Sequence, residues 1–244
     1  MYKAIKNLLI KALPGQWLHK SEPWLRKLYA IRYSGSNVYC NVCEGSFSAF
    51  IESDSHTICP SCGSIARNRR LWNILNQMGL NDDITVLDFS PSRCLYRKMH
   101  QLTINYIATD LSDDFIADHK YDITKLPMES GSVDLIICYH ILEHVPNDSM
   151  AMSELFRVLN DKGTCLIQTP FKKGDIYENE AITSPEARLE HFGQEDHVRI
   201  YSMDGLSQRL KNQGFKVSIL EFDESAGNRN GYSTTEVVLK CTKS

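Results

Sequence analysis

Two histidines and a glutamate stand together at the point where a buried strand is predicted to end. His140, Glu143 and His144 follow residues 133–139, an apolar run rich in β-branched side chains that is typical of a strand buried on both faces. Residues 148–169 then predict a helix and a second buried strand, which completes the unit of a parallel α/β sheet. Because ligands bind at the carboxyl ends of such strands, these three side chains are candidates for proton transfer or metal binding.

Four cysteines near the N-terminus form two C-x-x-C pairs, and each pair is followed by turn-forming residues. Cys40 and Cys43 are separated from Cys59 and Cys62 by fifteen residues. Four thiolates at this spacing are what a tetrahedral structural Zn²⁺ requires, and they leave no coordination position open for catalysis. The alternatives are a pair of disulfides or the relic of a zinc site. The segment resembles a zinc ribbon.

Charge is distributed unevenly along the 244 residues, whose formal net charge is −3. Residues 1–33 carry seven Lys or Arg against one acid, with apolar side chains and two tryptophans at helical spacing between them. Such a basic amphipathic segment fits an anionic membrane surface; the alternative is a helix that packs on the main domain or on a second subunit. The rest of the chain is acidic, which disfavours nucleic acid as a partner there.

The other four cysteines indicate the compartment. They are scattered, and three of them lie in apolar patterns, so we expect no disulfide framework and a reducing environment. The N-terminus lacks the pattern of a secretory signal, and no stretch approaches the roughly 20 apolar residues of a membrane span. We therefore expect a cytoplasmic protein, with peripheral membrane contact through residues 1–33. The sequence does not indicate an oligomeric state.

Residues 84–110 read as strand, helix, strand and acid. The first strand reaches Asp88, Ser90 and Pro91 begin the helix, and the second strand ends in Asp110. An acid about 20 residues after the first loop is typical of a nucleoside-binding α/β half, where it accepts hydrogen bonds from ribose hydroxyls.

Together these motifs resemble the class I S-adenosylmethionine (SAM)-dependent methyltransferases, in particular the type 11-like group. The resemblance rests on VLDFS, YIATD, DITKLPMESGSVD and ILEHV in family order, and it covers residues 84–244. The zinc ribbon and the stretch HFGQEDHVR resemble a bacterial subgroup of that family. The resemblance implies an α/β fold with a Rossmann-like seven-stranded sheet of order 3-2-1-4-5-7-6. Its third strand is expected at 121–123, and its antiparallel closing pair at 215–222 and 236–241.

The resemblance also implies SAM as the cofactor and gives roles to individual residues. Asp110, followed by Leu111, would bind the ribose hydroxyls, and Tyr139 would face the methionine end of the cofactor. Asp122 and Ile123 would contact the adenine edge. The expected cofactor-binding residues are Asp88, Phe89, Ser90, Pro91, Arg93, Asp110, Leu111, Asp122, Ile123 and Tyr139.

The first cofactor loop departs from the family pattern. The usual D-x-G-x-G-x-G has glycines that let the backbone approach the cofactor, whereas this chain has DFSPSRC. The N-terminus of the following helix can still offer N–H groups to the methionine carboxylate, and Arg93 can add a charge. The alternative is a degenerate, non-catalytic domain.

Some relatives that resemble this chain carry E-x-x-E-H after the strand that ends here at Tyr139, and those residues hold a divalent cation. By that resemblance we expect His140, Glu143 and His144 to bind a second metal, with His197 or His191 as a fourth ligand, and this donor set favours a transition metal over Mg²⁺. The alternatives are a histidine that acts as a plain general base and a hydrogen-bonded group that shapes the pocket. Arg199 is expected to hold an anionic group of the substrate.

We therefore expect an enzyme that methylates a hydroxyl of a small molecule, such as a sugar or a surface-polysaccharide precursor. The alternatives are an RNA methyltransferase that grips RNA through the zinc ribbon and a non-catalytic binding or scaffold protein. The expected domains are a basic amphipathic segment (1–35), the zinc ribbon (36–64) and the methyltransferase domain (65–244), with a polar lid at 174–192.

Overall fold

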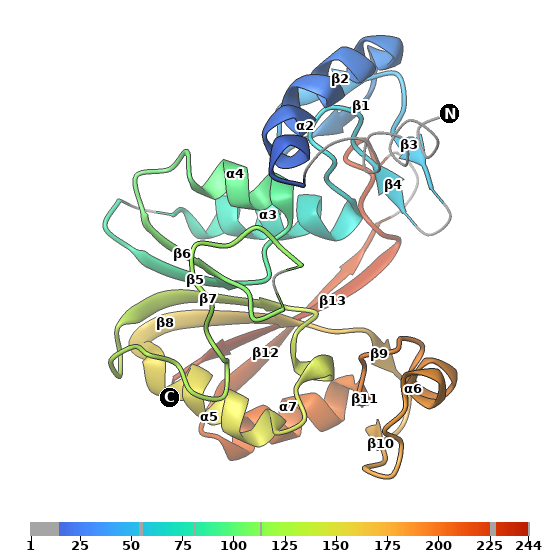
Figure 1. Cartoon of the computed structure of the whole chain (residues 1–244). Coiled ribbons are helices and arrows are strands. Elements are labelled where there is room, and N and C mark those ends of the chain that lie inside the picture. Colours follow the sequence, from blue (N-terminus) through green and yellow to red (C-terminus); the bar gives the residue numbers. More distant parts are fainter. Residues whose placement is uncertain (1–14, 54–55, 81, 113, 225–227, 244) are drawn as a thin grey trace. The chain divides into compact units, whose positions relative to one another are not determined.

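The chain forms two compact units in the computed structural model (Figure 1), which describes residues 15–53, 56–80, 82–112, 114–224 and 228–243. The first unit extends to Gly79 and includes residues 224–234, and the second holds residues 80–223 and the C-terminal strand. The units thus divide the chain at Gly79, whereas the sequence predicts a boundary at residue 65. Residues 1–14, the first part of the predicted basic segment, lie outside the described residues.

The first unit consists of short hairpins between two helices. Each cysteine pair begins at the end of a strand. Cys40 is the last residue of β1, and Cys59 comes directly after β4. Gly63 after the second pair and Gly79 at the end of α3 both have positive φ, which a glycine adopts at little cost. The elements are α2 (Gly15–Ala30), η1 (Ile31–Tyr33), β1 (Ser34–Cys40), β2 (Gly45–Phe47), β3 (Ile51–Glu52), β4 (Thr57–Ile58) and α3 (Ala66–Met78).

Arg69 of α3 is a fully buried side chain that ties this unit together. Its Nη1 donates to the carbonyl of Ser64 at 2.7 Å. Its Nε and Nη2 donate to the carbonyls of Asn230 and Gly231, at 2.5 and 2.6 Å. The guanidinium carbon also lies 4.1 Å from the centre of the Phe50 ring. One side chain therefore connects the second cysteine knuckle to residues 228–234.

Residues 228–234 also pair directly with the strand before the first cysteine pair. The Tyr39 N–H donates to the carbonyl of Arg229 at 2.7 Å, and the Asn230 amide donates to the carbonyl of Tyr39 at 3.1 Å. Arg70 forms an ion pair with Glu224 and lies over the Tyr232 ring. Arg69 and Arg70 of α3 are thus structural. Of the two alternatives that the sequence allows for these arginines, a solvated face or packing against the ribbon, Arg69 shows the second.

A six-stranded sheet forms the second unit, in the order β12-β13-β8-β7-β5-β6. The strands from β5 to β8 run parallel, and β13 runs antiparallel to both β8 and β12. The apolar runs predicted to be buried strands occupy its centre, as expected for a sheet covered on both faces. The strands are β5 (Thr85–Phe89), β6 (Asn105–Thr109), β7 (Val133–Tyr139), β8 (Leu159–Gln168), β12 (Lys216–Asp223) and β13 (Thr235–Thr242).

The sheet has the predicted methyltransferase order and differs from the prediction at one edge. The third strand expected at 121–123 is absent from the described residues; a single bridge between Thr109 and His119 takes its place. Asp122 instead begins a turn, because its carboxylate accepts hydrogen bonds from the backbone and hydroxyl of Thr124.

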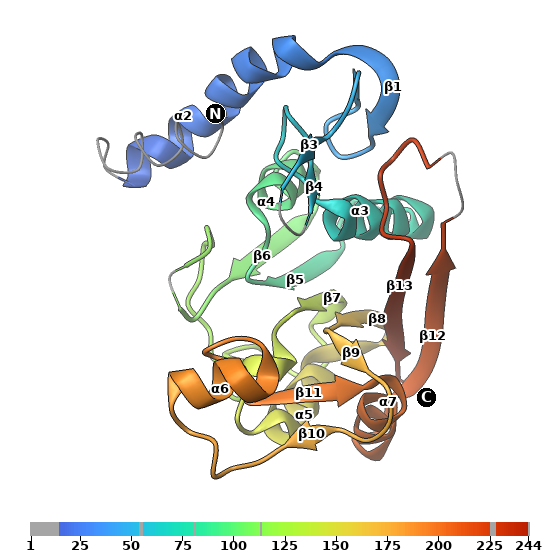
Figure 2. The ribbon, with the colours of Figure 1, turned by 90° about the vertical axis from the view of Figure 1, so that its right-hand side faces the viewer.

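Helices cover both faces of this sheet: α5 and α7 lie on one face and α4 on the other (Figures 1 and 2). The stretch predicted to be an irregular lid contains a short strand and a helix, which Ser184 caps through its hydroxyl. Within the described residues, no helix is long and apolar enough to cross a membrane. The remaining elements are α4 (Arg93–Met99), η2 (Leu142–His144), α5 (Asp148–Val158), β9 (Phe171–Lys172), β10 (Tyr177–Glu178), α6 (Pro185–Phe192), β11 (Arg199–Ser202) and α7 (Met203–Asn212).

Replacing Arg69 by leucine should destabilise the first unit. The carbonyls of Ser64, Asn230 and Gly231 would lose a donor, and the loss at the buried Ser64 carbonyl alone costs about 1–3 kcal/mol. We expect a lower thermal midpoint and faster amide hydrogen exchange at Gly231 and Tyr232, measured by mass spectrometry. Arg69→Lys keeps the charge without the planar fork and should give an intermediate effect. Lys173→Leu, at an exposed position, is the matched control. Unchanged exchange in Arg69→Leu would contradict the proposed role of the guanidinium.

Candidate functional site

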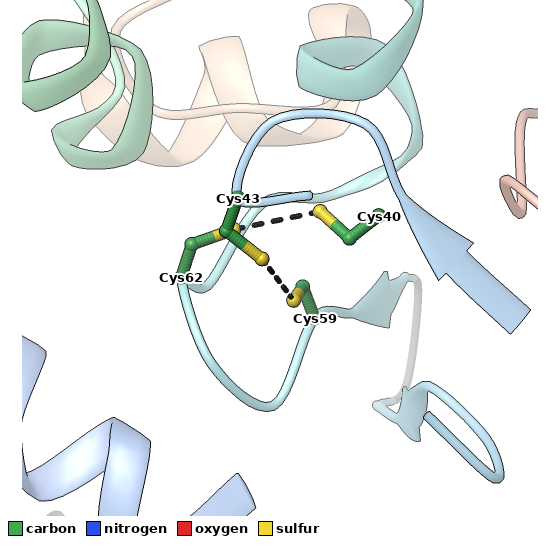
Figure 3. A group of neighbouring side chains, drawn as sticks. All are labelled: Cys40, Cys43, Cys59 and Cys62. Atoms are coloured by element: carbon green, nitrogen blue, oxygen red, sulfur yellow. Dashed lines mark hydrogen bonds between the residues drawn. The ribbon is translucent and has the colours of Figure 1, made fainter. Parts of the chain in front are cut away.

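The four cysteines converge in the first unit (Figure 3). Their sulfurs all lie within 4.8 Å of one another, with Cys40 and Cys62 3.6 Å apart and Cys43 and Cys59 3.7 Å apart. A disulfide would require about 2.05 Å, whereas four thiolates about 2.3 Å from one zinc ion lie about 3.8 Å apart. The geometry thus fits the predicted zinc ribbon with Cys40, Cys43, Cys59 and Cys62 as ligands.

Ser64 supports this cluster from the second knuckle. Its buried hydroxyl lies 3.2 Å from the sulfur of Cys40 and 3.2 Å from that of Cys62. Its carbonyl accepts the hydrogen bond from Arg69. The same residue thus connects the thiolates to the buried arginine, and such outer contacts fix the orientation of metal ligands.

In the second unit, the chain turns sharply where β7 ends. His140 has φ +57°, in the left-handed region that costs a residue with a side chain about 1–2 kcal/mol. Its N–H still donates to the carbonyl of Gln168 at 2.8 Å, so the turn is held against the neighbouring strand β8. The reversal leads directly into η2, which carries Glu143 and His144.

Glu143, His144 and His197 form the second group whose ligand atoms lie within 4.8 Å of one another. The His144 and His197 rings meet edge to face, with centroids 4.6 Å apart. Glu143 is only 1% exposed and His197 3% exposed. The backbone holds the two segments together, because the Val198 N–H donates to the carbonyl of Glu143 at 2.9 Å.

One polar contact orients each imidazole ring. The Nδ1 of His197 lies 3.2 Å from the carbonyl of Phe192, and the Nδ1 of His144 lies 3.0 Å from the carboxylate of Asp196. A carbonyl can only accept, so His197 carries a proton on Nδ1, and in its neutral form it keeps a lone pair on Nε2. Burial lowers the pKa of His197, with a further lowering from His144, which favours the neutral form.

Two of these groups are buried without a hydrogen bond. In the described part of the chain, the two carboxylate oxygens of Glu143 have no hydrogen-bond partner. The Nε2 of His197 has none either. Glu143 lies 3.2 Å from the Nδ1 of His140 as an ion-pair contact. Buried polar atoms are normally satisfied, so these atoms are positioned to receive a proton or to ligate a metal.

Arg199 and His191 do not join this group. Arg199 is buried and donates to the carbonyls of Leu142, Val145 and Pro146 and to Glu178. The Arg199 guanidinium therefore holds the turn after η2 in place. This favours a role for Arg199 in positioning that turn over the predicted binding of a substrate anion. His191 lies outside the cluster, with its Nδ1 2.7 Å from the Tyr177 hydroxyl.

A cavity of about 650 Å³, which no sequence motif indicates, lies beside this turn. Its wall includes ion pairs of Arg209 with Asp148 and Glu178. Arg188 of α6 also lines it, and the Nε of Arg188 has no hydrogen-bond partner among the described residues. Arg188 thus has the free donor that the sequence analysis attributed to Arg199.

The glycine-free loop keeps a conformation that glycine would adopt. Ser90 has φ +49° after β5, and its N–H donates to the carbonyl of Thr109 at 2.7 Å. Its hydroxyl donates to Asp110 at 2.6 Å, which offsets the cost of the left-handed backbone. Pro91 and Phe89 are buried beside it, and Arg93 is exposed at the start of α4.

The other predicted cofactor residues have varied environments. Asp110 is buried at the end of β6 and also accepts from the Ser112 hydroxyl at 3.0 Å, whereas Leu111 is exposed. Ile123 belongs to the hydrophobic core. Tyr139 ends β7, next to His140. Ser90, Asp110 and Tyr139 thus lie at the carboxyl ends of β5, β6 and β7, at one edge of the sheet.

Asp88 lies inside the sheet, not in the loop. It is buried in β5, and the hydroxyl of Tyr106 donates to it at 2.8 Å. Burial raises the pKa of Asp88 to about 7, and the Tyr106 hydrogen bond partly opposes this shift.

Comparison with known proteins identifies the class as the SAM-dependent methyltransferases. A family model described as a methyltransferase domain matches residues 61–218. The chain belongs to this methyltransferase domain family. In Mycolicibacterium smegmatis, a protein described as a "Probable S-adenosylmethionine-dependent methyltransferase" is 30% identical over 98 residues. The match covers 39% of this chain and 34% of that protein, about a third of its length.

Solved structures show the same fold. The YcgJ protein of Bacillus subtilis has a TM-score of 0.51 at 12% identity, over 72% of this chain and 99% of that one. Phosphoethanolamine N-methyltransferase 2 of Haemonchus contortus, in complex with S-adenosyl-L-methionine, has a TM-score of 0.52 at 14% identity, over 72% and 52% of the two chains. At such identities the likeness concerns the fold alone.

The raised pKa of Asp88 predicts a pH-dependent stability. The folded protein binds this proton more tightly than the unfolded chain, so the stabilising contribution is complete below about pH 4 and is lost as the pH rises through about 7. Asp88→Asn should therefore gain in thermal midpoint relative to the wild type between pH 5 and pH 8. Asp175→Asn, at an exposed carboxylate, is the control. A pH-independent difference for Asp88→Asn would contradict the assignment.

Proposed function

We propose that the protein transfers the methyl group of SAM to a hydroxyl of a small polar molecule. A sugar or a surface-polysaccharide precursor is the acceptor class that we favour. The observation that carries this proposal is the pair of buried proton acceptors, the Glu143 carboxylate and the His197 Nε2, neither of which has a hydrogen-bond partner among the described residues. Glu143 follows β7, the strand whose last residue would face the methionine end of SAM by the family resemblance, and the Val198 N–H holds His197 beside it.

The chemistry requires a base because a hydroxyl is a poor nucleophile while it keeps its proton. The oxygen–carbon bond forms as the sulfonium carbon–sulfur bond of SAM breaks, and the hydroxyl proton passes to Glu143 or to the Nε2 of His197. Arg199 holds the turn that carries Glu143, and Asp196 and the Phe192 carbonyl fix the two imidazoles. The protein's own contribution is thus alignment and proton removal.

We further propose that Glu143, His144 and His197 bind a divalent transition metal. Two imidazoles and a carboxylate are a donor set that such ions prefer. The contacts of His144 Nδ1 with the Asp196 carboxylate and of His197 Nδ1 with the Phe192 carbonyl are typical of metal-bound histidines and support the proposal. A bound metal would supply Lewis acidity toward the acceptor oxygen and lower its pKa. His140 is then a neighbour of Glu143 and not a ligand.

The cavity beside the turn supports a small acceptor that carries an anionic group. Arg188 lines it with a free Nε, and a guanidinium fork matches a carboxylate or a phosphate. Ser149, Asn179 and Gln213 add uncharged polar groups that suit hydroxyls. None of the eight cysteines forms a disulfide, which supports a reducing compartment such as the cytoplasm.

A non-catalytic binding protein is the second candidate, and one observation favours it. The carboxylate of Asp110, expected to bind the ribose, accepts hydrogen bonds from Ser90 and Ser112. SAM would have to compete with these hydroxyls, which would weaken its binding.

Calorimetry and methyl transfer test the proposed reaction. We expect the protein to bind SAM and to transfer its labelled methyl group to members of a panel of sugars and nucleotide sugars. Glu143→Gln should lower the transfer rate about 10²-fold or more and keep the SAM affinity, because a general base contributes about that factor. Glu190→Gln, at an exposed acid of α6, is the control. No SAM binding at millimolar concentration would favour the scaffold, and transfer to RNA alone would refute the small-molecule acceptor.

Metal analysis tests the two metal sites separately. After dialysis against Co²⁺, the wild type should hold two metal ions per chain, one with the thiolate absorption of a four-cysteine site and one without it. His197→Asn should lose only the second ion, and Cys59→Ser only the first. His191→Asn, whose ring contacts Tyr177, should keep both. One ion per wild-type chain would rule out the second site and leave the histidines as general bases.

A further inference from the structure

Helix α2 and the turn after it carry an exposed apolar stripe. Trp24, Leu28 and Ile31 are 64%, 47% and 67% exposed, in a structure whose other large apolar side chains are mostly buried. Their spacing of four and three residues puts them on one face of a helix. Lys27 and Arg32 are exposed along the same stripe.

The opposite face of α2 is occupied by the zinc ribbon. Arg26 and Glu22 form an ion pair at 2.9 Å, and their side chains are only 13% and 17% exposed. Arg26 packs on the second cysteine knuckle at Gly63, where an added Cβ would lie 2.8 Å from the guanidinium carbon. On a helix, positions 22 and 26 lie roughly opposite 24, 28 and 31. The contact with the ribbon therefore turns the apolar stripe outward.

The stripe combines apolar contact with positive charge. Glu22 is the single acid of residues 1–33, and it is paired with Arg26 on the ribbon side. Seven Lys or Arg are spread over the same residues. A partner for this face must therefore offer both negative charge and an apolar interior.

We propose that α2 and η1 dock on the surface of an anionic lipid bilayer. Trp24, Leu28 and Ile31 enter the boundary between headgroups and acyl chains, where tryptophan is favoured. Lys27 and Arg32 remain at the level of the lipid phosphates, and each basic residue near such a surface adds attraction. The ribbon presents the helix, because Arg26 anchors its other face at Gly63. This surface is independent of the proposed methyl transfer.

Vesicle sedimentation with the full chain tests the proposal. We expect the wild type to bind vesicles of 70% phosphatidylcholine and 30% phosphatidylglycerol, to bind pure phosphatidylcholine much less, and to be released by high salt. The triple variant Trp24→Ser, Leu28→Ser, Ile31→Ser should lose at least tenfold in partition coefficient. The matched control removes three exposed apolar side chains elsewhere, by Met150→Ser, Leu189→Ser and Ile219→Ser, and should bind as the wild type.

Three results would overturn the proposal. The first is that the wild type does not bind the anionic vesicles. The second is that the triple variant binds them as well as the wild type does. The third is that the wild type binds both vesicle compositions equally. Zinc content and circular dichroism of each variant show that it is folded. Lys27→Glu with Arg32→Glu keeps the apolar stripe and should also reduce binding at low salt; unchanged binding there would exclude the role of charge.

Discussion

A buried guanidinium must have its N–H donors satisfied by the protein, because water cannot reach it. This constraint acts in both units. Arg69 satisfies it with carbonyls of the second cysteine knuckle and of residues 230–231, and so joins the zinc ribbon to the loop between β12 and β13. Arg199 satisfies it with carbonyls at 142, 145 and 146, and so fixes the turn that carries Glu143. Both arginines use their planar fork to hold irregular backbone that no sheet or helix supports.

The cofactor loop shows how a family conformation can persist without its usual residue. Ser90 adopts the left-handed backbone at the position where the expected family pattern has glycine, and its hydroxyl donates to Asp110. The strain is thus offset by a hydrogen bond that a glycine could not form. The same bond occupies the carboxylate expected to bind ribose, so the proposed cofactor site would link loop conformation to SAM affinity through one pair of side chains.

Local patterns predicted a large part of this protein. The apolar runs predicted β5, β7 and β8, and the cysteine spacing predicted the four-sulfur cluster. His140, Glu143 and His144 were expected after β7, where they lie. The short strand at 121–123 was wrong because Asp122 forms a turn with Thr124, whose hydrogen bonds compete with strand pairing. The boundary at residue 65 differs from the compact units because α3 packs through Arg69 with residues distant in sequence, which no local pattern encodes.

The sequence by itself determined which residues can do chemistry, since residue type and spacing fix the donor atoms and the elements that carry them. Only the tertiary structure decided which of them meet. It brought His197, and not His191, to Glu143 and His144, because the Val198 N–H pairs with the carbonyl of Glu143 whereas His191 is held by Tyr177. It committed Arg199 to backbone carbonyls and left Arg188 facing a cavity. These outcomes depend on long-range packing and burial, which set hydrogen-bond partners and pKa values.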